Sequence, residues 1–483
     1  MIALVQINSP DYRYTFPPFG LLFVGYALKK AGYDVKIFHC TPEEISNVAK
    51  HIVKKDPIFV GFSVIIGKQT KFSADMSKLI KSMSDVPIVW GGPYPTLSME
   101  QCLSESYIDI VVLGEGEETA VDLAKALEKG KDLKNVKGIG YKKGNNIVVT
   151  KPRALINMDD YKMDWDLIDI KEYLRPNITW GCSRVLRYVT SRGCPYNCGF
   201  CYNLVFHKRR WRGRSKELII PEIEQLKDEY NIDGLVILDD NFFVDIERAF
   251  AILKAIDLPC RGDPVVKNVT RQFVKRLVEC NVRGMLIGLE SGSNRILKLM
   301  NKNITVRDII RCVRLISEAP QISPLYSFIL GVPTETWDET QKTIDLILRV
   351  HDIDPRALFT VGCYLPFPGT PFYEMAIRDG FVPPKRTEDW AIVDRWNDKL
   401  NPSWLPWADE TTAHKFVLIR SYANYLHIGT HLKFPLISWL SYQRLAHRNF
   451  SFSIDYYIME WLFRNVNLKP EGILTKLIKR KSK

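Results

Sequence analysis

The chain has 483 residues, of which 46% are hydrophobic and 25% are charged, a length sufficient for two or three domains with separate cores. No apolar run approaches the roughly 18–20 residues that a membrane-spanning helix needs, which excludes an integral membrane protein. Much of the formal net charge of +12 comes from residues 208–216 and the C-terminus, so it indicates local sites more than a uniformly basic surface.

The first part of the chain, residues 1–135, alternates short apolar runs with helical patterns. Runs of strand length occur at 3–6, 34–38, 57–64, 87–90 and 108–113. Helical patterns lie between them, as at 20–31 and 68–83. Strands that alternate with helices predict a parallel sheet covered on both faces. About five strands in this order predict an α/β, doubly wound, flavodoxin-like domain.

Glycines and short polar residues follow several of these predicted strands. Ser63 ends one strand, Gly91 and Gly92 end another, and residues 114–117 read GEGE after a third. In open α/β sheets the ligand crevice lies at the carboxyl ends of the strands. Glycine-bearing loops there favour a large ligand that approaches the backbone closely. Ordinary turn chemistry explains them equally well at this stage.

The rest of the chain divides into three parts. Residues 136–185 contain a hairpin pattern and an aspartate-rich stretch, and we expect a connector. Residues 186–375 repeat βα units, with strands at 186–190, 234–238, 284–288, 325–330 and 359–364. This pattern predicts a partial (β/α)6-type barrel with its active site at the C-terminal strand ends. Residues 376–483 are aromatic-rich with few strand signals, and we expect a helical C-terminal cap.

Ten cysteines are spread over the chain, but only Cys194, Cys198 and Cys201 lie close together, within eight residues. The N-terminus lacks the features of a signal peptide, so we expect a cytoplasmic protein in which disulfides are rare. Three thiolates on one loop can hold an iron–sulfur cluster and leave one iron open for a small molecule. A zinc knuckle is the alternative, but structural zinc sites favour a distant second CxxC pair, which this chain lacks.

The spacing CxxxCxxC after the first barrel strand, with Phe200 before the last cysteine, resembles the radical S-adenosylmethionine (SAM) superfamily. The resemblance implies a [4Fe–4S] cluster on the three cysteines, whose open iron binds the amino and carboxylate groups of SAM. Electron transfer then cleaves SAM to a 5′-deoxyadenosyl radical, while the protein supplies orientation and excludes water.

Further motifs match the same family in order. The three residues after the strand at 234–238 take the place of a motif at the methionine amino group, where a carboxylate facing an ammonium is favourable. A loop N-cap is the alternative for them. The segment GLESGS resembles the one near the ribose and carboxylate of SAM, and FILGVPTET the turn beside adenine. The SAM-binding residues that the resemblance implies are Phe200, Asp239, Asp240, Asn241, Glu290, Ser291, Gly331 and Pro333.

The N-terminal domain resembles the cobalamin (B12)-binding domain that precedes the radical core in one branch of this family, which includes C-methyltransferases and an anaerobic cyclase. The implied cobalamin-binding residues are Pro18, Gly20, Leu21, Ser63, Gly91, Gly92, Pro93, Tyr94, Gly114, Glu115, Gly116 and Glu117. The DxHxxG motif that supplies a histidine to cobalt elsewhere is absent. Tyr94 stands where a histidine is common, and a neutral phenol is a poor ligand for cobalt.

The resemblance implies a cobalamin-dependent radical SAM enzyme that methylates an unactivated carbon. The alternative is a radical cyclase, or an enzyme that joins or rearranges carbon centres, perhaps on a lipid, in which the N-terminal domain donates no methyl group. A third hypothesis is a non-catalytic iron–sulfur or nucleic-acid-binding module.

The expected partners follow from these hypotheses and from charge. They are a small-molecule, lipid or peptide substrate and an external electron donor of the flavodoxin or ferredoxin type. Residues 208–216, with Trp211, favour an ordinary linker over a nucleic-acid site. The basic, aromatic C-terminus favours a helical lid on the barrel, and a peripheral membrane contact is compatible with it.

Overall fold

The computed structural model describes residues 1–9, 16–393, 404–427, 435–451 and 453–465. The chain divides into two compact units. Unit 1 comprises Met1–Arg175, Arg184–Arg248 and Leu365–Asn397. Unit 2 comprises Pro176–Ser183, Ala249–Tyr364 and Asp398–Lys483.

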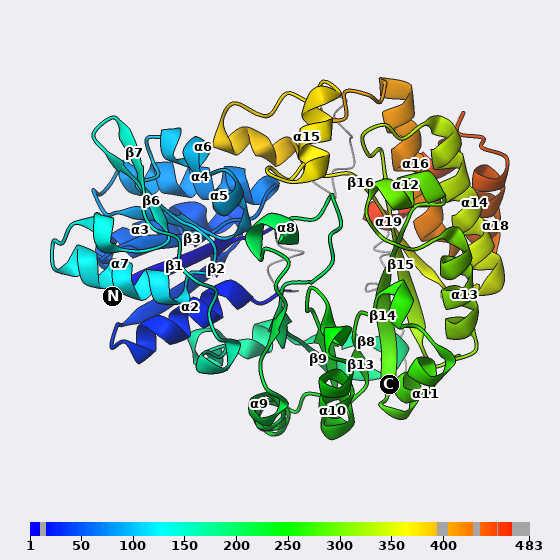
Figure 1. Cartoon of the computed structure of the whole chain (residues 1–483), viewed down its shortest axis with the longest axis horizontal. Helices are drawn as coiled ribbons and strands as arrows, with labels where there is room; N and C mark the ends of the chain where they lie inside the picture. The colour runs from blue at the N-terminus through cyan, green and yellow to red at the C-terminus, as the bar shows by residue number, and fades with distance from the viewer. Residues whose placement is uncertain (10–15, 394–403, 428–434, 452, 466–483) are drawn as a thin grey trace. The chain divides into compact units, whose positions relative to one another are not determined.

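Unit 1 begins with a sheet in the order β2-β1-β3-β4-β5-β6-β7, drawn in blue to cyan in Figure 1. Its strands are β1 (Ile2–Ile7), β2 (Val35–Cys40), β3 (Val60–Ser63), β4 (Ile88–Gly91), β5 (Ile110–Val112), β6 (Ile139–Lys143) and β7 (Asn146–Val149). Its helices are α2 (Phe19–Lys30), α3 (Ile45–Lys54), α4 (Lys68–Lys81), α5 (Pro93–Leu97), α6 (Met99–Ser104) and α7 (Glu117–Glu128).

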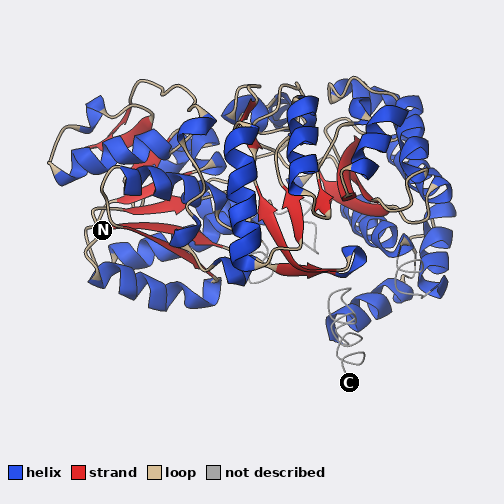
Figure 2. Cartoon of the chain, turned by 90° about the horizontal axis from the view of Figure 1, so that it is seen from below, coloured by secondary structure: helices blue, strands red, loops and turns tan. Residues whose placement is uncertain are grey.

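The first five strands are parallel, in the order of a doubly wound domain. Figure 2 shows helices on both faces of this sheet. α2 packs against α7, and α3 packs against α4. Strands covered on both faces must be apolar along their whole length, and Val5, Ile88 and Val111 are fully buried. The predicted flavodoxin-like domain is confirmed.

The hairpin β6–β7, which the sequence places in the connector, extends this same sheet. β6 pairs with β5 in antiparallel fashion, and β7 pairs with β6. Its alternating pattern indicated a hairpin, but a hairpin pattern does not say which strand it will pair with.

The remainder of unit 1 carries the first βα units of the second α/β region. β9 (Cys182–Tyr188) and β12 (Gly234–Ile237) pair in parallel. Between them lie a short antiparallel ladder of β10 (Ser191–Arg192) with β11 (Arg212–Gly213), α8 (Asn203–Phe206) and α9 (Lys216–Tyr230). α10 (Ile246–Ile256) follows β12, and α15 (Pro371–Arg378) belongs to this unit.

Unit 2 continues the βα repeat. β13 (Cys260–Arg261), β14 (Val282–Glu290), β15 (Ser323–Leu330) and β16 (Leu358–Cys363) are parallel and pair in chain order. Its helices include α11 (Arg271–Glu279), α12 (Asn294–Leu299), α13 (Val306–Ser317) and α14 (Trp337–Ile353). The six strands β9 and β12–β16, each followed by a helical segment, agree with the predicted partial (β/α)6-type barrel.

The C-terminal region is helical, as predicted, with α16 (Glu410–Leu426), α18 (Pro435–Ala446) and α19 (Ile454–Asn465). The predicted basic tail at 466–483 lies outside the described residues. Among the helices that the structure describes, none has both the length and the apolar character that crossing a bilayer demands.

Candidate cofactor site

The loop that carries Cys194, Cys198 and Cys201 runs from β10 to α8 in unit 1, and all three thiols are half-buried. The Cys201 N–H donates to the Cys198 carbonyl over 3.0 Å, which closes a turn between two of them. Burial, followed by the charges of Cys198, Asp240 and Cys194, raises the pKa of Cys201 to about 12. The three thiols therefore lie close enough to interact electrostatically.

This donor set fits an iron–sulfur cluster by its chemistry, since thiolates on one short loop are what such clusters use. Within the described part of the chain, no three His, Cys, Asp or Glu side chains stand as one group that could hold a metal ion. A cluster needs no such convergence on a single ion, because each thiolate binds a different iron atom.

The start of α15 packs directly on the cysteine loop. The Phe372 N–H donates to the Gly199 carbonyl over 3.1 Å, and the rings of Phe200 and Phe372 meet edge to face at 6.2 Å. A Cβ atom on Gly199 would lie 3.1 Å from the Phe372 ring. Glycine at this position therefore lets α15 close over the loop.

Asp239 and Asp240, which follow β12, hold the segment that leads into the cysteine loop. The buried Asp239 carboxylate accepts hydrogen bonds from the Thr190 N–H (2.6 Å), the Thr190 hydroxyl (2.6 Å) and the Ser191 hydroxyl (2.5 Å). Asp240 accepts from the Gly193 N–H over 2.7 Å and from the Tyr202 hydroxyl over 3.1 Å. These carboxylates shape the loop from both sides.

Asn241, the third residue of this motif, reaches one of the three cysteines of the loop. Its Nδ2 donates to the Cys194 sulfur over 3.6 Å. Its Oδ1 is buried and has no hydrogen-bond partner among the described residues. An orphaned acceptor beside the thiols fits a ligand that carries an ammonium group, such as SAM.

The predicted SAM residues Glu290 and Ser291 lie at the end of β14 in unit 2. Glu290 is buried, forms an ion pair with Lys302 over 3.1 Å and accepts from the Ser327 hydroxyl over 3.5 Å. Its backbone is left-handed, with φ at +65°. Such strain in a residue other than glycine is typical of functional sites. Ser291 lies 3.3 Å from the Thr343 hydroxyl.

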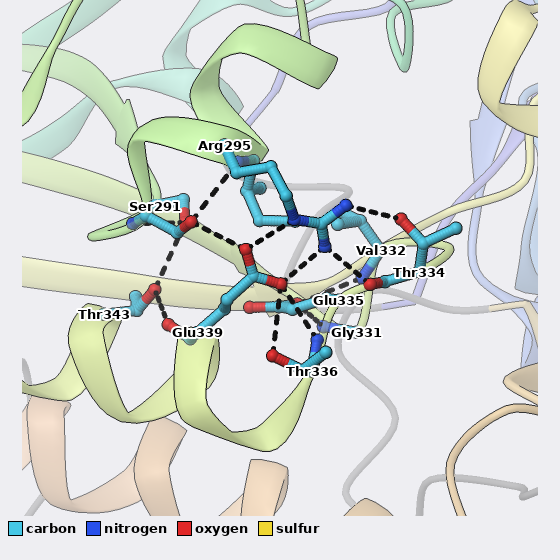
Figure 3. A network of polar contacts seen from close by, with 11 residues as sticks. Ser291, Arg295, Gly331, Val332, Thr334, Glu335, Thr336, Glu339 and Thr343 are labelled. Carbon is cyan, nitrogen blue, oxygen red and sulfur yellow. Dashed lines mark hydrogen bonds and ion pairs between the residues drawn. The ribbon is translucent and has the colours of Figure 1, made fainter.

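The predicted adenine turn at Gly331 and Pro333 is shaped by Glu335, which Figure 3 shows beside it. One Glu335 oxygen accepts from the Gly331 N–H (2.7 Å) and the Val332 N–H (3.2 Å). Burial raises the pKa of Glu335 to about 7. Pro333 lies inside this turn, which the Glu335 N–H closes by donating to the Val332 carbonyl over 3.0 Å.

An ion pair links this turn to the segment that carries Ser291 (Figure 3). Arg295 Nε donates to Glu339 over 2.7 Å, and an Arg295 amine donates to the Thr334 carbonyl over 2.7 Å. The hydrogen bond from Arg295 is the largest factor that lowers the pKa of Glu339, to about 2. One polar network thus joins Ser291 to the turn that carries Gly331 and Pro333, while Glu290 is held separately by Lys302 and Ser327.

A cavity of about 440 Å³ lies in unit 1 at the C-terminal edge of the first sheet. Ten of the twelve predicted cobalamin residues line it, the exceptions being Pro18 and Tyr94. The loops after β9 and β12 line it as well, through Arg192, Tyr202, His207 and Asp240. The same cavity therefore touches both the glycine loops and the cysteine loop.

The glycines of this cavity fit a bulky ligand such as cobalamin. A Cβ atom on Gly20 or Gly114 would meet no protein atom within 4 Å, so these positions are open. Gly92 has φ at +99°, and a Cβ there would lie 3.0 Å from the Val64 carbonyl oxygen. Glycine at these positions leaves no side chain between the backbone and the cavity, which allows a large ligand to approach closely.

Tyr94 lines a neighbouring cavity of about 500 Å³ instead. It is fully buried, its hydroxyl donates to Gln101 over 3.3 Å, and its ring lies 6.0 Å from that of Trp390. Burial raises the pKa of Tyr94 above its ordinary value, so the phenol stays neutral. Tyr94, which was predicted to bind cobalamin, therefore lies outside the lining of the first cavity.

Sequence reasoning missed the arginines that bind Glu115 and Glu117. Arg192 donates to Glu115 over 3.1 Å and to Glu117 over 2.6 Å. Arg212 donates to both Glu115 oxygens, over 2.8 and 2.9 Å. Arg212 comes from the basic stretch at 208–216, for which a nucleic-acid site was the alternative to a linker. A signal was present in the sequence, because two acids in a glycine loop require cationic partners if they are buried.

Other side chains of the basic stretch are also engaged within the protein. Arg214 forms an ion pair with Glu222 over 2.7 Å. Trp211 Nε1 donates to the Ser191 hydroxyl and to the Asn241 carbonyl, each over 3.0 Å. The Trp211 ring therefore belongs to the packing around the cysteine loop.

Comparisons with known families and proteins agree with this geometry. Residues 188–347 match the model of the radical SAM superfamily, and residues 9–124 match that of the B12-binding domain. An uncharacterized methyltransferase of Pyrococcus horikoshii is 33% identical over 391 residues, which cover 79% of this chain and 83% of the relative.

Two further relatives differ in their named activity. The anaerobic magnesium-protoporphyrin IX monomethyl ester cyclase of Synechocystis is 30% identical over 332 residues, which cover 64% of each chain. The solved structure of the cobalamin-dependent SAM radical enzyme OxsB, with aqua-cobalamin and SAM bound, has a TM-score of 0.64 at 19% identity. The match covers all of this chain and 75% of OxsB, and it shows a shared fold.

Proposed function

This chain belongs to the radical SAM superfamily, in the branch with a B12-binding domain ahead of the radical core, and from that premise we propose that it methylates an unactivated carbon. The observation that carries the proposal is the cavity of about 440 Å³ in unit 1, which is lined both by the glycine loops of the first sheet and by residues around the cysteine loop. A methyl donor in that cavity would lie beside the site where the radical is made.

The proposal assigns each group of residues a cofactor. Cys194, Cys198 and Cys201 would hold a [4Fe–4S] cluster, and the residues that line the cavity would hold cobalamin. The cluster with SAM supplies a hydrogen-abstracting radical, and methylated cobalamin supplies the methyl group. The residues of this chain position these groups: Asp239 and Asp240 fix the loop, and Asn241 offers its orphaned oxygen to an ammonium.

The residues of unit 2 would bind the other parts of SAM. Glu290 and Ser291 would face its ribose and carboxylate, and the turn with Gly331 and Pro333 would lie beside adenine. The support is the polar network that already joins these segments within the unit. An external donor of the flavodoxin or ferredoxin type would deliver the electron.

A radical cyclase or carbon–carbon bond-forming activity is the second candidate. The similarity to the Synechocystis cyclase favours it. The two candidates differ in their product, because only the first transfers a methyl group to the substrate.

The decisive experiment is anaerobic purification from cells supplied with hydroxocobalamin, followed by iron, sulfide and cobalt analysis. We expect about four irons per chain, stoichiometric cobalamin, and cleavage of SAM on reduction. Iron without cobalamin would favour the cyclase-type candidate. Protein without iron or SAM cleavage would contradict the radical chemistry altogether.

Filling the cavity from Gly20 tests the cobalamin site. Gly20 is the second residue of α2, and its Cβ direction is open, so Gly20→Phe is expected to leave the melting temperature and iron content unchanged. Cobalamin affinity should fall by at least about 10-fold, since the ring occupies the space of the ligand. Absorbance titration with hydroxocobalamin measures this. The control is Lys125→Phe, at an exposed position on α7; equal affinity in both variants would place the ligand elsewhere.

We also propose a cytoplasmic location with a peripheral contact to anionic membranes through the C-terminal helices. Leu436 and Trp439 on α18 are 65% and 57% exposed, and Ile454, Tyr457 and Ile458 on α19 are 53% to 65% exposed. These spacings place the apolar side chains of each helix on one face.

Vesicle sedimentation tests this contact. The chain is expected to sediment with phosphatidylserine-rich vesicles and not with neutral ones, because anionic lipid attracts the basic tail. Trp439→Asp should weaken the binding by at least about 5-fold. Val382→Asp is the matched control, since Val382 is 74% exposed but lies outside these helices. Equal binding of both variants, or no binding by the wild type, would contradict the proposal.

A further inference from the structure

We infer that Arg192 and Arg212, with Glu115 and Glu117, form an ionic clamp that makes cofactor binding in the cavity and the state of the cysteine loop depend on each other. The inference rests on the proposed function, and it assigns the two arginines as positioning residues.

The first observation that supports the coupling is that the backbone on both sides of Arg192 is held in place. Ser191 and Gly193, on either side of it, are held by Asp239 and Asp240, and Cys194 follows immediately. The Arg192 side chain extends the other way, to the loop after β5 and over the Phe23 ring of α2 at 4.3 Å. One residue therefore joins the entry to the cysteine loop with the wall of the cavity.

The second observation that supports the coupling is the pairing of charges in the β10–β11 ladder. Arg192 and Arg212 lie directly opposite each other in this antiparallel pair. Like charges in that position destabilise a ladder. Glu115 resolves the conflict, because its carboxylate accepts hydrogen bonds from both guanidinium groups. The ladder that frames the cysteine loop is thus stabilised by a residue of the B12-type domain.

Because the clamp is mostly buried, each of its four side chains needs its partner of opposite charge. The side chains of Glu115 and Glu117 are 3% and 2% exposed, and those of Arg192 and Arg212 are 15% and 18% exposed. Two positive charges meet two negative ones, so the group is neutral as a whole. Removing one of the four side chains leaves an opposite charge buried without its partner, which lowers the stability of the fold.

Glu117 connects the clamp to a ligand. One of its oxygens binds Arg192, while Oε2 is buried and has no partner among the described residues. Glu117 also lines the cavity. A ligand that donates an amide N–H there would satisfy Oε2 and fix the carboxylate that holds Arg192. Occupancy of the cavity would in this way order the strand that enters the cysteine loop.

Coupling of this kind is reciprocal, so it can be measured from either side. Hydroxocobalamin is titrated by absorbance into the anaerobic full chain, once with the cluster reconstituted and once after iron chelation. We expect the wild-type dissociation constant to be at least about 5-fold lower when the cluster is present. Arg192→Gln is expected to weaken binding by about 10-fold and to abolish this dependence on the cluster.

Two variants separate positioning from general damage. Arg192→Lys keeps the charge but cannot bridge both carboxylates, so it should restore only part of the coupling. Arg153→Gln is the matched control, because Arg153 forms ion pairs with Glu118 and Asp122 on α7. It should behave as the wild type. If Arg192→Gln retains wild-type affinity and wild-type dependence on the cluster, the clamp does not couple the sites.

Hydrogen exchange of residues 114–117 provides a readout that needs no cobalamin. Removal of iron should increase exchange there in the wild type, and Arg192→Lys should show the increase already with iron present. Should the wild type bind no cobalamin, the proposed function fails, and the exchange result alone decides the clamp. Exchange that does not respond to iron in the wild type would overturn it.

Discussion

Cys198→Ala is expected to lose its bound iron and to cleave SAM at least about 100-fold more slowly than the wild type, because two thiolates do not retain a cluster that needs three. Cys198 lies at the middle of the loop, and its carbonyl closes the turn to Cys201. That backbone contact survives the substitution, so the fold should persist. Iron analysis and the rate of 5′-deoxyadenosine formation measure the effect.

The control for this variant is Cys280→Ala, at the end of α11 and outside the loop. It should retain iron and SAM cleavage at wild-type levels. Equal iron content in the two variants would mean that the loop is not the cluster site. Loss of iron in both would point to instability and not to lost ligands.

Glu115→Leu is expected to lower the free energy of unfolding of unit 1 by about 3–5 kcal/mol, since it leaves two arginines buried without their shared carboxylate. The substitution also removes the acceptor of the Ile156 N–H, which donates to Glu115 over 3.0 Å. Glu118→Leu is the matched control on the same loop and helix. Glu118 is 44% exposed, and its ion pair should contribute less than about 1 kcal/mol.

The pH dependence of stability gives this prediction a second measurement. Burial raises the pKa of Glu115, but the Arg212 hydrogen bonds and the charges of both arginines outweigh it and hold the pKa at about 2, below its ordinary value of 4.5. A lowered acid pKa stabilises the fold above the ordinary value, and this stabilisation is lost as the pH falls from 4.5 towards 2.

Urea unfolding between pH 6 and pH 3 tests whether the free energy of unfolding falls on acidification. The wild type should lose stability across the lower part of this range, and Glu115→Gln should be less stable at pH 6 but lose less on acidification. Parallel curves for the two proteins would show that Glu115 does not carry the effect. Glu117, Arg192, Arg212 and His207 are the charged or titratable groups around it; burial lowers the pKa of His207 to about 4.

Local patterns in the sequence predicted the helices and strands well, because a strand that is buried on both faces consists mainly of apolar residues. β1, β3 and β4 are continuous apolar runs for this reason. The hairpin β6–β7 shows the limit of such patterns. Its alternation was visible, but its pairing with β5 depends on geometry that no local pattern contains.

The same difference between local patterns and long-range contacts applies to the candidate site. The spacing of Cys194, Cys198 and Cys201 could be recognised because all three candidate ligands lie on one loop. The contacts that shape that loop come from far away: Asp239 and Asp240 bind residues 47 to 49 positions earlier. Glu115 and Arg212 are 97 positions apart. A single sequence carries no signal for such pairings.

The contacts of the cysteine loop have a consequence for how its metal centre is assembled. Asp239, Asp240 and Phe372 fix the loop through protein groups alone, and these contacts do not depend on iron. Removal of the cluster should therefore loosen the loop and its contacts locally, and leave the rest of unit 1 folded. A zinc finger folds only when its ion is bound. This domain, in contrast, should stay folded in the presence of chelators, and its cluster should be reconstituted without refolding.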